Sequence, residues 1–245
     1  MTELTVQVIA EHNEGGWLLY AGNFPGAYTR GATLEEASAK WDAEMTAYLR
    51  WRCGAAPEEL RCLPVTAQDQ VSQLQICDAD SDVLFDSERP PLTREEYETL
   101  KALCLRSAGD FLALYESIPD KSASSLPRRK TFYGHVPRTA EEMYLHTKQV
   151  NAYYFGEIDV AADNEPDILC CRAAGFAALE QQPDFLENRL FSGSYGEDWT
   201  LRKLLRRFLW HDRIHAKAMT RMAARLWSAE KFADPFLFLA DPKDR

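Results

Sequence analysis

The sequence predicts an α+β domain over residues 1–92, with the element order β-β-β-α-β, followed by an all-α four-helix bundle with a C-terminal tail over residues 93–245. Segments with strand periodicity are confined to the first part, whereas four amphipathic helical patterns follow one another in the second. The charge balance changes at the same place: residues 1–92 carry 6 Lys and Arg against 15 Asp and Glu, and residues 93–245 carry 22 against 23.

Alternation of apolar and polar residues and the positions of turn residues define the elements of the first part. Thr33, followed by Glu36 three residues later, is typical of a helix N-terminus, and Gly54 suits the end of the same helix. We interpret residues 57–64 as a proline-containing linker and His12 as a solvated turn residue. The expected elements are strands at residues 4–8, 17–21 and 27–30, a helix at residues 33–52, and a fourth strand at residues 71–77 with 83–85 as an extension.

The helices of the second part begin at recognisable caps. Thr93 and Thr139 each precede a Glu by three residues, which is the capping-box pattern, and Asp198 is the expected N-cap of the last helix. Prolines delimit the others. The expected helices start at Thr93, Thr139, Pro166 and Asp198.

His211 and His215 lie one turn apart on the last helix, inside its apolar stripe. Burial removes water from both imidazoles, and a metal ion is one of the few partners that satisfies two of them at once. The basic residues are placed on the opposite side, where we expect a solvated charged face; the alternative is that this flank attracts a carboxylate-bearing thiol. These residues are Arg202, Lys203, Arg206, Arg207, Arg213, Lys217, Arg221 and Arg225.

A third inward-facing histidine, His146, lies on the helix that starts at Thr139, and together with His211 and His215 it forms a candidate metal site. Three protein ligands leave a coordination position open, as catalytic sites do. An ion there could activate a thiol for transfer or water for hydrolysis, and the residues do not choose between these reactions. Either reaction implies a small-molecule substrate.

Three further residues are candidates for supporting roles. Glu142 is one turn before His146 and could orient it, although its capping position explains it equally well. Asp212 points away from His211 and is expected to pair with a neighbouring helix. Tyr153 is a weak catalytic candidate as a donor to a substrate oxyanion, with core packing as the alternative.

The histidines sit in longer patterns that resemble the DinB/YfiT-like superfamily over about residues 93–228. The matching segments are Thr139-x-Glu141-Glu142-Met143-x-x-His146, Thr200-Leu201-Arg202-x-x-Leu205 and Trp210-His211-Asp212-Arg213-x-His215-x-Lys217-Ala218-Met219. The resemblance implies a four-helix bundle in which His146, His211 and His215 hold a divalent metal ion, zinc or nickel, with iron as the alternative. It also implies a low-molecular-weight thiol such as mycothiol or bacillithiol as cosubstrate, and a homodimer.

Residues 3–54 resemble the HicB family of small domains, many of which are antitoxins. The residues that carry this resemblance are Phe24-Pro25-Gly26 and Gly31-x-Thr33-Leu34-Glu35-Glu36-Ala37. Because the first part has a net charge of −9, we expect no nucleic-acid partner and interpret it as an interaction or substrate-covering module. The alternative functions are therefore a regulatory or protein-binding module without catalysis, a metal-dependent hydrolase, and a metal ion with a purely structural role.

The remaining expectations concern the environment of the protein. No apolar run approaches the length of a transmembrane helix and no signal peptide is visible, so we expect no membrane association. The six cysteines lack framework spacing and are expected to be reduced thiols in a cytoplasmic protein. Phe232, Phe236 and Phe238 are expected to pack across the bundle or to form a dimer contact.

Overall fold

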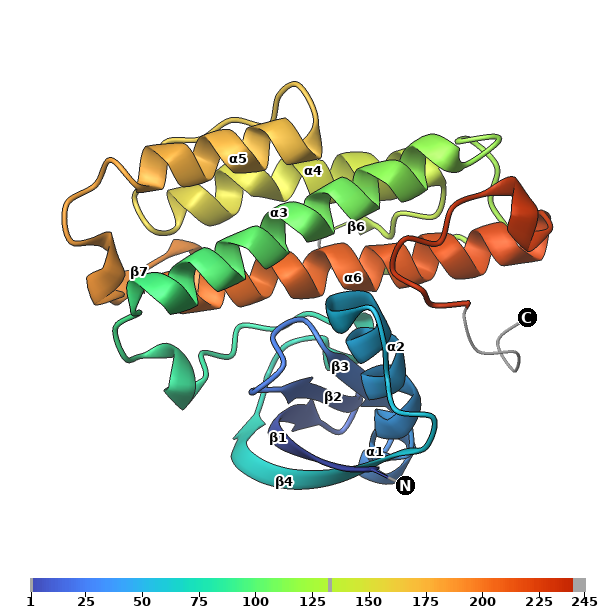
Figure 1. Cartoon of the computed structure of the whole chain (residues 1–245), viewed down its shortest axis with the longest axis horizontal. Coiled ribbons are helices and arrows are strands. Elements are labelled where there is room, and N and C mark those ends of the chain that lie inside the picture. The colour runs from blue at the N-terminus through green and yellow to red at the C-terminus, as the bar shows by residue number, and fades with distance from the viewer. Residues whose placement is uncertain (1, 132–133, 240–245) are drawn as a thin grey trace.

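The computed structural model describes residues 2–131 and 134–239. A small sheet with its helix α2 lies beneath a layer of long helices, and the longest of these, α6, passes directly above the sheet domain (Figure 1). The order of a mixed sheet followed by helices agrees with the predicted change from α+β to helical structure.

The sheet has the strand order β3-β2-β1-β4. β1 pairs antiparallel with β2, β2 pairs antiparallel with β3, and β4 pairs parallel with β1 along the other edge. Two helices cover the sheet and bury Trp41, Met45 and Tyr48 against it. The bounds of these elements are β1 Thr2–Asn13, β2 Gly16–Ala21, β3 Tyr28–Gly31, α1 Leu34–Ser38, α2 Trp41–Cys53 and β4 Leu60–Val71.

Three predictions for this part are wrong. The fourth strand lies at Leu60–Val71 and includes most of residues 57–64, which we interpreted as a linker. Within the expected strand at residues 71–77, the chain instead enters a short 3-10 helix, η1 (Ile76–Asp78). β4 is an edge strand with mostly exposed side chains, so it lacks an apolar alternation, and an edge tolerates Pro64. The expected helix is broken at Ala39 and Lys40 into α1 and α2. His12 belongs to β1, where it stacks on Trp17.

Four long helices, α3 to α6, make up most of the second part. α3 and α4 pack against each other, and each of them also packs against α5 and α6. The capping boxes at Thr93 and Thr139 are confirmed. The N-cap of α6 is Thr200 and not Asp198, because residues 198–199 pair with residues 191–192 as a short ladder. The bounds are α3 Arg94–Ser117, β5 Lys130–Thr131, β6 Gly134–His135, α4 Ala140–Gly156, α5 Ile168–Leu179, β7 Phe191–Ser192, β8 Asp198–Trp199 and α6 Leu201–Leu226.

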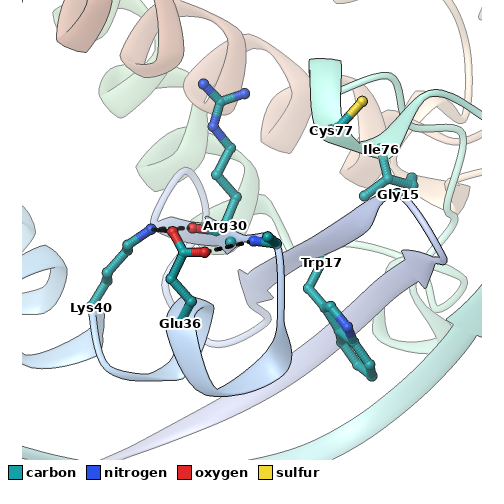
Figure 2. Close-up of a pocket in the computed structure, with 9 residues that line it drawn as sticks. Gly15, Trp17, Arg30, Glu36, Lys40, Ile76 and Cys77 are labelled. Atoms are coloured by element: carbon teal, nitrogen blue, oxygen red, sulfur yellow. Dashed lines mark hydrogen bonds and ion pairs between the residues drawn. The ribbon is translucent and has the colours of Figure 1, made fainter.

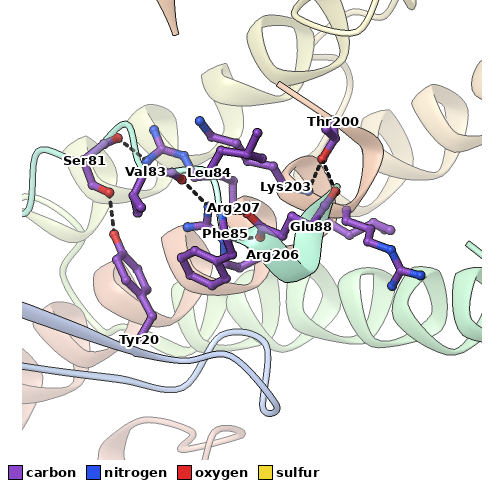
Figure 3. Close-up of polar contacts among 12 residues, drawn as sticks. Tyr20, Ser81, Val83, Leu84, Phe85, Glu88, Thr200, Lys203, Arg206 and Arg207 are labelled. Carbon is purple, nitrogen blue, oxygen red and sulfur yellow. Dashed lines mark hydrogen bonds and ion pairs between the residues drawn. The ribbon is translucent and has the colours of Figure 1, made fainter. Parts of the chain in front are cut away.

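The sequence predicts a solvated basic side of α6, and this prediction is wrong for the first half of the helix, although Arg221 and Arg225 near its end are exposed as expected. Lys203, Arg206, Arg207 and Arg213 are buried, and most of their contacts are with the first 92 residues. Figure 3 shows several of these cations reaching into the segment that connects β4 to α3. α6 therefore belongs to both parts of the molecule: one side packs in the helical layer and the other holds the sheet domain.

The connecting segment binds these cations mainly through backbone oxygens and Glu88. Arg206 forms an ion pair with Glu88 at 2.5 Å and also donates to the carbonyl of Val83 at 2.9 Å. Lys203 Nζ donates to the carbonyl oxygen of Asp82 at 2.6 Å, and Arg207 donates to that of Ser81 at 2.7 Å. Since each buried cation has acceptors within reach, the contact avoids the large cost of an isolated buried charge.

Glu44 on α2 is the second acidic anchor for α6. Its carboxylate accepts from Arg213 at 3.0 Å and from Lys217, and it also accepts from the backbone amide of Tyr28. Burial raises the pKa of Glu44, but the charges of Lys217 and Arg213 more than offset this, and the net pKa lies below its ordinary value. At Gly26 (φ +94°), an added Cβ would meet the Leu209 Cβ at 2.9 Å, so the chain can approach α6 this closely only as glycine.

The aromatic tail packs within the chain. Phe236 is fully buried and its ring centroid lies 5.4 Å from that of Trp51 on α2. The ring of Phe238 faces the guanidinium of Arg213 on α6 at 5.3 Å. The tail thus covers the junction between α2 and α6.

A buried hydrogen-bond chain links the sheet to the connecting segment. The Tyr20 hydroxyl donates to Ser81 Oγ at 2.7 Å, and Ser81 Oγ donates to the Glu11 carboxylate at 2.5 Å (Figure 3 shows the contact between Tyr20 and Ser81). Burial raises the pKa of Glu11 from 4.5 to about 7.

We predict that Glu44→Gln destabilises the protein by about 3–5 kcal/mol, because Arg213 and Lys217 would keep buried charges without a counter-charge. Urea unfolding measures the effect. The matched control is Glu98→Gln, which removes an exposed pair with Arg94 and should change stability by less than about 0.5 kcal/mol. Equal effects of the two substitutions would contradict the anchoring role of Glu44.

Glu11 should make stability depend on pH. Because its pKa is higher in the folded state, folding takes up a proton, and stability falls as the pH rises from 4.5 towards about 7. The loss is at most about 3 kcal/mol. In Glu11→Gln this component should be absent, whereas Glu3→Gln, on the same strand but exposed, should retain it. The difference between the urea midpoints at about pH 5 and about pH 8 measures this pH dependence. The same difference in Glu11→Gln as in the wild type would contradict the role of Glu11.

Candidate metal centre

Three of the histidines converge at one point between α4 and α6. The ring nitrogens that His146, His211 and His215 offer all lie within 4.8 Å of one another. The Nε2 atoms of His146 and His211 are 3.2 Å apart, and the His215 ring centroid lies 4.7 Å from that of His146 and 4.6 Å from that of His211. The other two histidines lie elsewhere, His12 in the sheet and His135 in β6.

Local helix geometry produces this convergence. His211 and His215 are four residues apart on α6 and share one face of the helix. His146 comes from the second turn of α4, whose start is fixed by the Thr139 capping box. Because α4 packs against α6, the three rings meet although they are separated by up to 69 positions in the chain.

The three histidines differ in their exposure to solvent. His211 is only 7% exposed, whereas His146 and His215 are half-buried. Burial lowers the pKa of all three imidazoles. The charges of the other two histidines and Arg207 lower the pKa of His211 further, and the charges of His146 and Arg30 lower that of His215 further. The rings are therefore neutral near pH 7, which is the form that binds a metal ion.

The donor set fits a divalent metal ion. Bond lengths of about 2.0–2.1 Å in a tetrahedral site place two ligand nitrogens about 3.3 Å apart, close to the separation of the two Nε2 atoms. The short distance between the two Nε2 atoms could instead reflect a hydrogen bond between His146 and His211, but such a bond would not involve His215. Among the described residues, the buried Nδ1 of His211 also has no hydrogen-bond partner. One ion accepts a nitrogen from all three rings, and imidazole ligands suit zinc, nickel and iron.

Aromatic and cationic side chains surround the buried side. The ring of Tyr154 lies 6.0 Å from that of His211, and the Arg207 guanidinium lies 5.5 Å from the Tyr154 ring. We did not expect either residue beside the histidines, although each has a spacing signal: Arg207 is one turn before His211 and Tyr154 is eight residues after His146. The assignment of all basic residues to the side opposite the histidines is thus wrong for Arg207.

Tyr153 lies farther along α4. It is 37% exposed, and its ring contacts are with Tyr154 and Trp199; within residues 2–131 and 134–239, none is with a histidine. Burial, followed by the charges of Glu197 and Glu157, raises the pKa of its hydroxyl above the ordinary value. Tyr153 therefore keeps its hydroxyl proton near neutral pH but contacts no histidine ring within the described residues, and its catalytic role stays a prediction.

The two acidic candidates have other partners. Asp212 forms a fully buried, bidentate ion pair with Arg172 on α5, at 2.6 and 3.1 Å, as the pairing with a neighbouring helix predicted. The Glu142 carboxylate accepts from the backbone amides of Arg138 and Thr139, at 2.8 and 3.2 Å. Glu142 thus acts as a helix cap and not as a partner of His146.

A cavity of about 280 Å³ lies within the first part of the chain, between β2, β3, α1 and η1. Arg30, Trp17, Lys40 and Glu36 are among its lining residues, and Figure 2 shows the Arg30 side chain extending away from Glu36 and Lys40.

Comparisons with models of known protein families, with curated proteins and with solved structures gave no match. None of the helices in the described part of the chain is both long and apolar enough to cross a membrane.

We predict that Glu142→Ala lowers stability by about 1 kcal/mol through loss of the cap and leaves zinc affinity within about tenfold of wild type. Loss of a residue that orients a metal ligand costs about 10–100-fold in affinity. Glu96→Ala is the matched control, because it removes the equivalent capping-box residue of α3. Urea unfolding and competitive zinc titration measure the two effects. A large loss of zinc affinity in Glu142→Ala alone would show that Glu142 supports the histidines.

Proposed function

We propose that this protein is a metal-dependent enzyme that acts on a small molecule, with His146, His211 and His215 as ligands of a divalent metal ion. The observation that carries the proposal is the convergence of three neutral imidazoles, of which His211 is buried and the other two are partly exposed. Zinc or nickel is the proposed ion, with iron as the alternative. Catalytic sites have this form, because three protein ligands leave room for a substrate.

We further propose that α3, α4, α5 and α6 form a DinB-like four-helix bundle and that the sheet domain is HicB-like. The support for the first is the motif around each histidine and the mutual packing of the four helices. The support for the second is the order of three strands, helices and a fourth strand, together with Phe24-Pro25-Gly26.

In this proposal each side chain has a separate task. A divalent ion in such a site supplies Lewis-acid activation of a nucleophile near neutral pH. His211 is buried in the helical core, whereas His146 and His215 are partly exposed and would border the side from which a substrate enters. Tyr154 and the buried Phe208, whose rings lie 5.3 Å apart, keep water from the back of the cluster.

We propose group transfer involving a low-molecular-weight thiol as the reaction, on the strength of the resemblance at residues 139–146 and 200–219. In such a transfer the thiol sulfur forms a bond to an electrophilic carbon, the leaving group departs with its bonding electron pair, and the thiol proton passes to solvent. Hydrolysis is the competing reaction at the same site.

Metal analysis of the purified full-length chain tests this proposal. We expect close to one divalent ion per chain in the wild type and loss of most of it in His211→Ala, because removal of one of three ligands weakens binding strongly. His12→Ala is the matched control, since His12 pairs with Asp69 in the sheet domain, and it should keep its metal.

The other outcomes separate the alternatives. A wild-type protein that neither contains metal nor binds added zinc, yet melts normally, would overturn the proposal. A bound ion whose chelation lowers the melting temperature, without turnover on thiol or ester panels, would indicate a structural role. Turnover of esters or amides without a thiol would indicate a hydrolase.

A further inference from the structure

A second, smaller cavity lies where the two parts of the chain meet. Its volume is about 140 Å³, and its lining residues come from the end of β2, the connecting segment, α3 and α6. Because a water molecule occupies about 30 Å³ in the liquid, this space suits a ligand of about four or five non-hydrogen atoms. The lining residues include none of the three clustered histidines, so the cavity is a different site from the candidate metal centre.

One buried side chain of the cavity wall, Arg206, has an unused hydrogen-bond donor. Arg206 is only 3% exposed, and its Nε and Nη2 atoms donate to the two carboxylate oxygens of Glu88 at 2.5 and 3.1 Å. Nη2 also donates to the carbonyl oxygen of Val83 at 2.9 Å. Among the described residues, the buried Nη1 atom of the same guanidinium has no hydrogen-bond partner. A buried donor without an acceptor is costly, so a ligand that supplies an acceptor here gains binding energy.

The guanidinium is fixed in position without a ligand. Glu88, its partner, also accepts from the backbone amide of Phe85 at 2.9 Å, and the Phe85 ring centroid lies 4.0 Å from the guanidinium carbon of Arg206. Figure 3 shows these three side chains next to one another. A group that is already ordered loses little freedom when it binds a ligand, and this favours binding.

The charges of the cavity wall favour an anion. Arg202 and Arg206 are both lining residues, and Glu88 is the one carboxylate among them. Arg202 also pairs with Glu96 at 3.1 Å, but Glu96 is 48% exposed and lies outside the cavity, so solvent screens its charge. The wall therefore carries an excess of positive charge.

The other walls are mainly apolar. Ala21 and Phe85 are buried, and Pro25 and Leu100 complete this surface. Guanidinium groups match the planar geometry of a carboxylate, whereas apolar walls favour an alkyl chain. The combination fits a small molecule that has one carboxylate and a short apolar body.

We propose that this cavity binds a short-chain monocarboxylate, whose oxygens accept from Arg206 and are attracted by Arg202, and whose alkyl part contacts Phe85 and Leu100. The site goes beyond the proposed function and does not require the metal ion. Because the cavity has walls from both parts of the chain, a ligand in it holds the sheet domain and the helical layer together.

A ligand-observed NMR titration of the full-length protein with propionate tests the site. We expect saturable binding with a Kd of about 1–10 mM, since so few ligand atoms limit the affinity. Propionamide has the same shape without the charge and should bind about tenfold or more weakly. Arg202→Gln should weaken propionate binding about tenfold, because it removes one of the two cations. Arg94→Gln, which removes an exposed arginine of α3, is the matched control and should bind like the wild type.

A second variant tests the cavity without changing its charge. Leu100→Trp should abolish binding, because the larger side chain occupies the apolar end of the cavity. Leu105→Trp is the matched control, since Leu105 is a partly buried leucine of the same helix that does not line the cavity. Arg206 itself is kept, because its replacement would leave Glu88 buried without a counter-charge.

The inference is overturned if propionate binding does not saturate by about 50 mM, if propionamide binds as tightly, or if Leu100→Trp binds like the wild type. Loss of binding in His211→Ala would assign the ligand to the histidine cluster and would also overturn it. Melting curves show that each variant is folded. Propionate binding by a wild-type protein that takes up no metal contradicts the proposed enzyme alone, and metal uptake without propionate binding contradicts the cavity site alone.

Discussion

The burial of the cationic side of α6 against Glu44 and Glu88 is the constraint on which the rest of the structure depends. A buried ion pair is tolerated only when its partners meet in good geometry, so these two contacts fix both the rotation and the axial position of α6 on the sheet domain. With that rotation set, His211 and His215 face α4, and Gly26 and Tyr28 contact the helix through Arg213 and Lys217. The orientation of two of the three histidines follows from the same docking.

Much of the helical part could be predicted because its determinants are local. The capping boxes at Thr93 and Thr139 use hydrogen bonds between residues three apart, and the pairing of His211 with His215 on one face follows from the helical repeat. The inward position of His146 could also be predicted, because the helical periodicity places it on the apolar face of α4. These features together were sufficient to place three imidazoles at one point, which the structure shows.

The features that the sequence did not predict depend on contacts between distant segments. The basic residues of α6 predict a solvent-exposed side, yet Lys203 and Arg213 are fully buried because Glu197 and Glu44 neutralise them. Glu44 is far from α6 in the sequence, so no local pattern identifies it as the partner of Arg213. β4 lacks alternation because an edge strand buries few side chains. Glu142 and Tyr153 both have helical spacing to His146, which suggested a supporting role. In the structure Glu142 accepts from the backbone amides of Arg138 and Thr139, and Tyr153 contacts the indole of Trp199.

The composition of β4 has a consequence for the behaviour of the protein at high concentration. The outer side of this twelve-residue strand is an open row of backbone groups to which a strand of another molecule could add. Pro64 cannot donate a hydrogen bond to such a strand, and the register shift opposite Val8 and Ile9 interrupts a regular ladder. Arg61 and Asp69 add charge along the same edge. These features oppose edge-to-edge aggregation, which explains why a segment that looks so unlike a strand is suited to form this one.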